Sequence, residues 1–454
     1  MLRQLAATLI ATCGIALLGA APASTPASGV TVPVVYRTLS NGLRVVISED
    51  HTLPVVTVML YYGIGFRIEP KGRTGFAHLF EHLMFQTSRD LPKLGFIKLV
   101  EGNGGELNGS TRLDFTNFYE NVPANALEPM LWAEANRMGG LTFTAAGLKN
   151  QQDVVKSEVR VNVINSPYGG FPWLTVPQYA FSNYYNAHNF YGDLHDIDAA
   201  TNADALKFYK TYYRPNNAAL AIVGDVNPAT ALALVQKYFG KIPSAPIPKS
   251  PDVRETPQTA ERHGSVVDAL APRPALALSY RLPARETDAF YAMEVLRNLL
   301  ASGTDSLLYK RLVVADRLTG SVSSSVHSLG NLYNVTGPTT MDVWMFHDAD
   351  KTTAQITAAV DDEIAKIRRD GVPPDLLQRV IARELSTLYD QVGNTQSRAD
   401  LLAGFALFDD RPQKINGLDA RFRAITPELL KRTADTYLIP SNRTVVEIRT
   451  KEQK

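Results

Sequence analysis

The residues His78, Glu81 and His82 form the pattern His-x-x-Glu-His, which has the residue types and spacing of a metal-dependent hydrolytic site. On a helix of about 3.6 residues per turn, the two histidines lie one above the other and Glu81 lies on the same side. Two imidazoles at this spacing can bind one tetrahedral Zn²⁺ and leave room for a third protein ligand and a water. Glu81 would then be the general base that takes a proton from that water.

The sequence around this motif has the periodicity of an amphipathic helix. Apolar side chains recur at i, i+3, i+4, i+7 and i+8, at Phe76, Leu79, Phe80, Leu83 and Met84. Thr74 is the expected N-cap. A pair of ordinary core or surface histidines is the alternative, but ionisable groups on a half-buried stripe are costly without a metal to pair them.

A second candidate ligand, Glu158, lies 76 residues beyond His82 in the stretch Asp-Val-Val-Lys-Ser-Glu. Residues 144–163 are expected to form a helix, and Val154 and Val155 place Glu158 beside an apolar stripe. Taken alone, this glutamate could equally lie on a solvated helix face. Together, His-x-x-Glu-His and the distant glutamate resemble the pitrilysin (insulinase) family of zinc peptidases, the inverzincins.

The resemblance implies a role for each of these residues. His78, His82 and Glu158 would bind one Zn²⁺ per chain, and Glu81 would be the catalytic base. The family usually has another glutamate seven residues before the ligand, where this chain has Gln151. Gln151 could still donate a hydrogen bond to a metal ligand, but it cannot supply the negative charge.

Residues 106–111 and 115–119 are expected to form a strand pair after the Gly-rich stretch 102–105. The first strand resembles the family's edge strand beside the zinc, which pairs with extended substrate through main-chain hydrogen bonds. The expected substrate-binding residues are therefore Glu106, Leu107, Asn108 and Gly109. From the residues alone, an internal hairpin strand is an equal alternative.

Two further histidines, His188 and His195, are alternative metal ligands in principle. No carboxylate or third histidine stands at helical spacing to either of them, which disfavours this role. They resemble the family's His-x-x-Tyr-Gly loop, which is structural.

The chain contains an internal repeat with an offset of 225 residues. Residues 211–217, followed by a β-rich run, match residues 436–442 and the run after them, and Thr201 and Thr426 share the offset as expected helix N-caps. The second copy's helix, 288–300, contains no histidine, so one metal site per chain is expected.

The expected fold class is α+β, with two homologous αβ domains that form half of a clamshell. Each domain would be a mostly antiparallel sheet with helices packed on one face. The predicted boundaries are residues 24–241 for the zinc-binding domain, 242–262 for a Pro- and Ser-rich linker, and 263–454 for the homologous domain without a metal site.

Residues 1–23 have the pattern of a cleaved secretory signal. Arg3 precedes an apolar run over 5–18, and Ala21-Pro22-Ala23 is a cleavage sequence. The run is short for a membrane span, and a lipoprotein box at Cys13, the single cysteine, is the disfavoured alternative. Cleavage would leave a thiol-free chain, which suits a secreted or periplasmic protein.

Composition excludes some classes of partner. Lysine and arginine number 46 against 45 aspartate and glutamate, and no basic run stands out, which argues against nucleic acid. No second apolar run of membrane-spanning length follows the signal, so no membrane partner is expected in the mature chain.

The last motif bears on whether the chain needs a partner chain to be active. Active members of the family carry an Arg-x₆-Tyr element that holds the substrate backbone from the opposite half of the clamshell. The expected positions hold Val313 and Gly320 here, and neither Arg311 nor Arg317 has a tyrosine seven residues later. We therefore expect an exported zinc endopeptidase that acts on peptides or unfolded segments and pairs with a homologous chain bearing the clamp. A homodimer and a non-catalytic or chaperone-like peptide-binding subunit are the alternatives.

Overall fold

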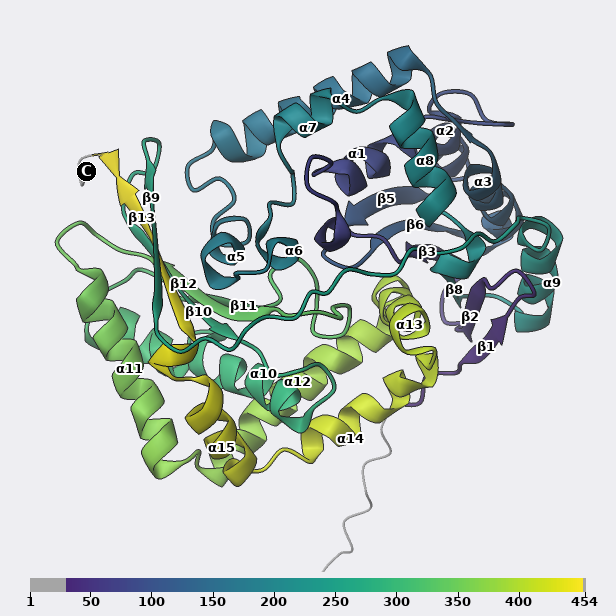
Figure 1. Ribbon diagram of the computed structural model, residues 1–454. Helices are drawn as coiled ribbons and strands as arrows, with labels where there is room; N and C mark the ends of the chain where they lie inside the picture. The colour runs from purple at the N-terminus through teal and green to yellow at the C-terminus, as the bar shows by residue number, and fades with distance from the viewer. Residues whose placement is uncertain (1–29, 452–454) are drawn as a thin grey trace, which may run out of the picture.

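The computed structural model describes residues 30–451, and the predicted signal peptide lies outside them. Two β-sheets lie side by side, each with its own set of helices (Figure 1). The first sheet has the order β1-β2-β8-β3-β6-β5 and the second has the order β11-β12-β10-β13-β9. A two-stranded ribbon joins β4 (Thr87–Ser88) to β7 (Leu141–Thr142).

Each sheet is built from strands of one half of the chain. The first sheet contains β1 (Val35–Thr38), β2 (Arg44–Glu49), β3 (Val55–Tyr62), β5 (Glu106–Thr111), β6 (Thr116–Pro123) and β8 (Ala218–Gly224). The second contains β9 (Arg262–Asp268), β10 (Ala275–Arg281), β11 (Ser323–Val326), β12 (Thr340–Phe346) and β13 (Arg443–Thr450).

The two sheets have the same strand order once β1 is set aside. The order β2-β8-β3-β6-β5 corresponds to β9-β13-β10-β12-β11, and each sheet contains one parallel pair, β2 with β8 and β9 with β13. All other pairs are antiparallel. The predicted fold class of two mostly antiparallel αβ units is therefore confirmed.

The predicted repeat is also visible in the helices before β8 and β13. Thr201 caps α8 (Asn202–Tyr212) by accepting a hydrogen bond from Asp204 N, and Thr426 caps α15 (Pro427–Tyr437) by accepting one from Leu429 N. A 3₁₀ turn follows each helix and leads into the strand. The same local signals thus produce the same helix-turn-strand unit 225 residues apart.

Helices of each half cover one face of their own sheet. In the N-terminal half these are α1 (Phe76–Leu83), α2 (Gly95–Gly102), α3 (Leu127–Gly140), α4 (Ala145–Val159), α8 and α9 (Pro228–Phe239), which share one apolar core with the sheet. In the C-terminal half they are α10 (Asp288–Ala301), α11 (Thr353–Asp370), α12 (Pro374–Gly393), α14 (Leu418–Arg423) and α15.

The opposite face of each sheet is covered by the other half of the chain. Helix α13 (Thr395–Asp409) packs on β3 and β8 of the first sheet, and α5 (Thr175–Ala180) packs on β13 and β9 of the second. An antiparallel sheet commonly leaves one face to solvent. Here β8 and β10 are buried along their whole length, because each half supplies a helix to the other.

Residues 243–260 form no helix or strand and run along the N-terminal half as an extended segment. The carboxylate of Glu255 accepts hydrogen bonds from the backbone N–H groups of Ser182 and Asn183, and Asn186 donates to Val253 O. The segment is therefore held against the end of α5 and the start of α6 (Tyr184–Ala187), while α7 (Leu194–Asp198) follows further along the chain.

Among residues 30–451, no helix is both long enough and apolar enough to span a membrane.

Candidate metal centre

Helix α1 carries His78, Glu81 and His82, and its position is fixed by an apolar face. Leu79, Phe80 and Leu83 point into the core between the helix and the first sheet. This is the stripe that the periodicity predicts, and it leaves the polar stripe facing α4 and β5. The histidines therefore lie where a second helix and an edge strand meet the motif.

The predicted N-cap of this helix is wrong. Thr74 donates its hydroxyl to Asp196 Oδ2 at 2.7 Å instead, and the helix begins after Gly75, whose φ is +76°. The free N–H groups of Gly75 and Ala77 donate to the two carboxylate oxygens of Glu69, at 2.8 and 2.6 Å. A carboxylate from the preceding turn thus caps the helix, where it also faces the positive end of the helix dipole.

His188 belongs to this cap rather than to the metal site. Its Nε2 lies 3.5 Å from Glu69 Oε2, and its Nδ1 lies 3.0 Å from Tyr184 O. Burial raises the pKa of Glu69, and the neighbouring His188 and the helix N–H groups oppose that rise. His195 is exposed on α7. The structure brings neither histidine to the predicted ligands.

The atoms His78 Nε2, His82 Nε2 and Glu158 Oε2 converge on one point. The two nitrogens lie 3.3 Å apart, and the glutamate oxygen lies 3.6 Å from His78 and 3.4 Å from His82. A tetrahedral Zn²⁺ with bonds of about 2.0–2.1 Å needs ligand atoms about 3.3 Å apart. The donor set of two imidazoles and one carboxylate therefore fits zinc in type and in separation.

The electrostatics of the cluster favour metal-binding protonation states. Burial and the neighbouring His82 lower the pKa of His78 to about 4, which keeps its imidazole neutral at neutral pH. Burial opposes ionisation of Glu158, but His82, His78 and Tyr191 outweigh it and hold the pKa of Glu158 below its ordinary value. The side chains of His82 and Glu158 are 20% and 29% exposed, so the cluster is open on one side.

Glu81 lies beside the cluster without belonging to it. Its Oε2 accepts a 2.7 Å hydrogen bond from the hydroxyl of Thr111, the last residue of β5. Burial raises the pKa of Glu81, and the Thr111 bond partly opposes the rise. A carboxylate with a raised pKa is a stronger base, which is the property that proton abstraction requires.

Tyr191 is a site residue that the sequence did not predict. Its hydroxyl donates to Glu158 Oε1 at 3.1 Å, and its ring packs against His78 with centroids 5.2 Å apart. The ring of Phe190 also packs against His78, with centroids 4.8 Å apart, and against the ring of Tyr191. The signal was present as the His-x-x-Tyr-Gly loop, whose histidine supports the helix cap and whose tyrosine contacts a predicted ligand.

Gln151 is buried on α4, two turns before Glu158. Its amide donates to Asn150 Oδ1 at 2.8 Å. His78 Nδ1 is buried, with no hydrogen-bond partner among the described residues. A hydrogen bond from Gln151 to a metal ligand therefore stays a prediction.

Strand β5 is at the edge of the first sheet and pairs with β6 alone among the described strands. The alternative of an internal strand is therefore wrong. Glu106 and Asn108 are exposed, while Leu107 packs against the core of the N-terminal half. Their role in substrate binding stays a prediction.

The C-terminal half has no equivalent cluster of metal ligands within the described residues. Helix α10 follows β10 as α1 follows β3, but it carries Glu294, Arg297 and Asn298. Arg297 pairs with Glu294, and Asn298 donates to Glu384 on α12. In the C-terminal half, the guanidinium of Arg297 therefore hydrogen-bonds to the carboxylate of Glu294, and the amide of Asn298 hydrogen-bonds to that of Glu384.

The positions of the missing clamp lie after α10. Val313 is half-buried in the π-helical segment Tyr309–Ala315, and Gly320 is exposed. Arg311 is paired with Asp316 and Asp362. Arg311 is therefore a surface residue whose guanidinium is held in ion pairs.

Comparison with known proteins agrees with this geometry. The family model described as Insulinase (Peptidase family M16) matches residues 44–168, which include the converging histidines and glutamate. The model described as Peptidase M16 inactive domain matches residues 199–384, which include none of them.

One relative and two solved structures cover nearly the whole chain. The protein named zinc protease PqqE, from Helicobacter pylori, is 27% identical over 422 residues, which cover 90% of this chain and 91% of that protein. A crystal structure of a protease from Helicobacter pylori matches with a TM-score of 0.85 and 25% identity, over 92% of this chain and 100% of that chain. The periplasmic protease PqqL from Escherichia coli shares the fold at a TM-score of 0.74 and 20% identity, over 92% of this chain and 48% of that one. From its two matching domain models, its relative and its two-domain fold, the chain belongs to peptidase family M16, the insulinase family.

Proposed function

We propose that the chain is an exported zinc endopeptidase that hydrolyses peptides or unfolded polypeptide segments. The observation that carries the proposal is the convergence of His78 Nε2, His82 Nε2 and Glu158 Oε2 within 3.6 Å of one another, with the carboxylate of Glu81 beside them. Its site would lie in a zinc-binding domain of residues 24–241, joined through residues 242–262 to a second domain of residues 263–454.

In this proposal His78, His82 and Glu158 hold one zinc per chain. When bound, zinc would supply Lewis acidity, which lowers the pKa of a water and polarises the scissile carbonyl. Tyr191 holds Glu158 through its hydroxyl, and Gln151 is the proposed further hydrogen-bond donor behind the ligands.

Glu81 performs the proton transfers of the reaction. Its carboxylate accepts a proton from the attacking water and then donates a proton to the leaving amine. Thr111 keeps the carboxylate aimed at the site through a hydrogen bond to one oxygen, which leaves the other oxygen free for the proton.

The substrate would bind as an added strand along β5. On the side away from β6, the backbone of Glu106, Leu107, Asn108 and Gly109 pairs with no other described strand. The N–H of Gly109 donates to Asn108 Oδ1 at 2.8 Å and would exchange this bond if a substrate strand pairs there. Main-chain pairing needs an extended partner and demands little of its side chains, so it favours peptides and unfolded segments over folded proteins.

The test is a metal and activity measurement on matched variants. Glu81→Gln should keep about one zinc per chain and lose hydrolysis of an unstructured peptide, whereas His78→Ala, His82→Ala and Glu158→Ala should lose the metal. Glu101→Gln makes the same chemical change at an exposed position and should behave as the parent. Normal turnover by Glu81→Gln would contradict the mechanism.

The proposed active unit is a heterodimer with a homologous chain that supplies an arginine and a tyrosine. Two observations support it: Val313 and Gly320 occupy the clamp positions, and the similar PqqL chain from Escherichia coli is about twice as long. The chain would be assayed alone and with a candidate partner on one peptide. Full activity alone, unchanged by the partner, would leave the homodimer as the remaining assembly.

The absence of the clamp residues also favours a second candidate function, that of a non-catalytic or chaperone-like peptide-binding subunit. Bound zinc without cleavage of any peptide, alone or with a partner, would favour it. Secreted or periplasmic material beginning near Ser24 in intact mass spectrometry would support the proposed export.

A further inference from the structure

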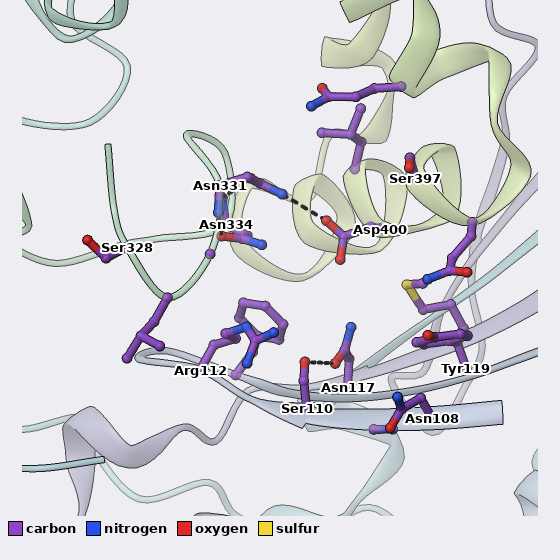
Figure 2. A pocket seen from close by; sticks show the side chains of 18 residues that line it. Asn108, Ser110, Arg112, Asn117, Tyr119, Ser328, Asn331, Asn334, Ser397 and Asp400 are labelled. Atoms are coloured by element: carbon purple, nitrogen blue, oxygen red, sulfur yellow. Dashed lines mark hydrogen bonds between the residues drawn. The ribbon is translucent and has the colours of Figure 1, made fainter. Parts of the chain in front are cut away.

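A cavity of about 510 Å³ lies behind the edge strand, between the two halves of the chain. Strands β5 and β6 form its floor, and residues 328–334 and the first turns of α13 form the opposite wall. Figure 2 shows Arg112 and Asn117 on the sheet side facing Asn331, Asn334 and Asp400 across the open space.

The cavity and the candidate metal centre lie on opposite faces of the same strand. Thr111 points to α1, where its hydroxyl contacts Glu81 and Ala77 O. Its neighbour Ser110 points the other way and lines the cavity, where it donates to Asn117 Oδ1 at 2.5 Å. Successive side chains of a strand alternate between the faces of a sheet.

The same alternation applies to a substrate strand added along β5. Every second side chain would lie on the face of α1 and the metal ligands, and the side chains between them would lie on the cavity face. Asn108, Gly109 and Ser110 line the cavity, so it reaches the strand with which the substrate would pair.

The cavity wall is polar and carries two charged groups, Arg112 and Asp400. Asp400 already accepts hydrogen bonds from Tyr61 and from Asn331, one on each carboxylate oxygen. Arg112 makes a single hydrogen bond in the described structure, from Nη1 to Thr111 O at 3.1 Å. A guanidinium has five N–H donors, so most of the donors of Arg112 remain available.

We propose that this cavity is a specificity site of the peptidase that receives a carboxylate of the bound peptide, with Arg112 as its principal donor. The proposal rests on the proposed function, because the peptide must pair along β5. We assign the carboxylate to an aspartate or glutamate side chain, since Asn108, Gly109 and Ser110 within the strand line the cavity together with Arg112 just past its end. A free C-terminal carboxylate is the other source of the same chemistry.

The experiment uses the zinc-loaded chain together with the candidate partner chain of the proposed heterodimer, and a set of unstructured peptides. Each peptide carries one Glu, Gln or Lys, moved through successive positions, with a free or amidated C-terminus. We expect kcat/KM at least tenfold higher for Glu than for Lys at alternate positions around the cleaved bond, with Gln between them. Equal ratios at all positions, or a preference for Lys, would overturn the proposal. Loss of the preference on amidation would overturn the side-chain assignment in favour of the C-terminal carboxylate.

Two variants locate the preference in the cavity. Arg112→Gln should reduce the Glu-to-Lys ratio toward one. Ser397→Asp places a carboxylate on the opposite wall, in the first turn of α13, where the helix dipole favours it, and should also reduce the ratio. Arg379→Gln, at an exposed site on α12, should leave the ratio unchanged. A preference that survives both cavity variants would overturn the proposal.

A binding measurement separates this proposal from the proposed function. Zinc-loaded Glu81→Gln should hold labelled peptides without cutting them, and fluorescence anisotropy should show at least tenfold tighter binding of the Glu peptide than of the Lys peptide. Absence of cleavage by the parent chain with a retained Glu preference in binding would contradict the peptidase function alone. Cleavage without any Glu preference would contradict the specificity site alone.

Discussion

Thr111 on the edge strand β5 donates a 2.7 Å hydrogen bond to Glu81 on α1. The strand that would bind substrate and the carboxylate that would act as base are therefore joined directly. Thr111 is the last residue of β5, and it is paired with Thr116 of β6, which fixes its height along the strand. The hydroxyl of Thr111 therefore couples the position of the Glu81 carboxylate to the strand that would set the register of the substrate.

Replacing Thr111 by valine tests this coupling. Valine keeps the β-branched shape but removes the donor, so the Glu81 carboxylate loses the group that orients it. We expect kcat to fall about tenfold, as for loss of one hydrogen bond to a charged group, with metal content unchanged. Thr111→Ser keeps a hydroxyl and should retain most of the activity. Equal kcat values for the valine and serine variants would contradict the role.

Tyr191→Phe should weaken metal binding. The tyrosine hydroxyl donates to Glu158 Oε1, and loss of a hydrogen bond that orients a metal ligand typically costs about 10- to 100-fold in metal affinity or activity. Competition with a chelator of known zinc affinity measures the change. Tyr185→Phe removes a hydroxyl from another tyrosine of the same segment and is the control. Unchanged affinity in Tyr191→Phe would show that Glu158 needs no such support.

Local periodicity predicted much of the fold. The bounds of α1 and α10 follow from apolar spacing, and the caps at Thr201 and Thr426 follow from residue type. These features depend on neighbours within a few residues, so the sequence carries them directly.

The features that were missed depend on contacts between distant segments. Thr74 is drawn away from the helix by Asp196, 122 residues further along the chain, which leaves the cap to Glu69, and Tyr191 reaches Glu158 from 33 residues away. Helix α13 of the C-terminal half packs on the first sheet, and α5 of the N-terminal half packs on the second. This arrangement depends on how the two halves pack against each other. No local spacing encodes such contacts, although the convergence of His78, His82 and Glu158 was expected from the family resemblance.

Glu69 should stabilise the fold through the start of α1. Glu69→Ala leaves the N–H groups of Gly75 and Ala77 without their acceptor, and we expect a loss of about 2–6 kcal/mol in the free energy of unfolding, for two buried donors at about 1–3 kcal/mol each. Glu69→Gln keeps one acceptor oxygen and should lose less. Urea denaturation of the metal-free chain measures both. An alanine variant as stable as the parent would exclude the cap.

His327 should make the protein less stable in acid. Burial, opposed by Asp114 and reinforced by Arg67 and Arg112, lowers the pKa of His327 to about 3. Between pH 6.5 and pH 3 the unfolded chain binds a proton at this residue and the folded chain does not, so stability falls as pH falls. From pH 7 to pH 4 this amounts to about 3 kcal/mol, at about 1.4 kcal/mol per pH unit below the unfolded pKa of about 6.5.

The comparison variant for this effect is His327→Asn, because His327 has a φ of +57° and asparagine tolerates that conformation. Other titrating groups contribute equally to both proteins, so the difference between their stability curves isolates the histidine. The asparagine variant should lose less stability between pH 7 and pH 4 in urea denaturation. Parallel curves would show that His327 is protonated in the folded state or is not buried in solution.

Restoring the clamp should raise activity through the partner chain. A Cβ at Gly320 would meet no atom within 4 Å, and Val313 is half-buried, so Val313→Arg with Gly320→Tyr can be accommodated. A single donor aimed at the developing oxyanion is worth about 3–4 kcal/mol, or 10²- to 10³-fold in kcat. The double variant would also carry His78→Ala, which removes its own metal site, and would be mixed with the parent chain. Activity should then appear at least tenfold above that of either chain alone. His78→Ala without the clamp is the control, and a mixed dimer, verified by mass, that gains no activity would refute a clamp acting between chains.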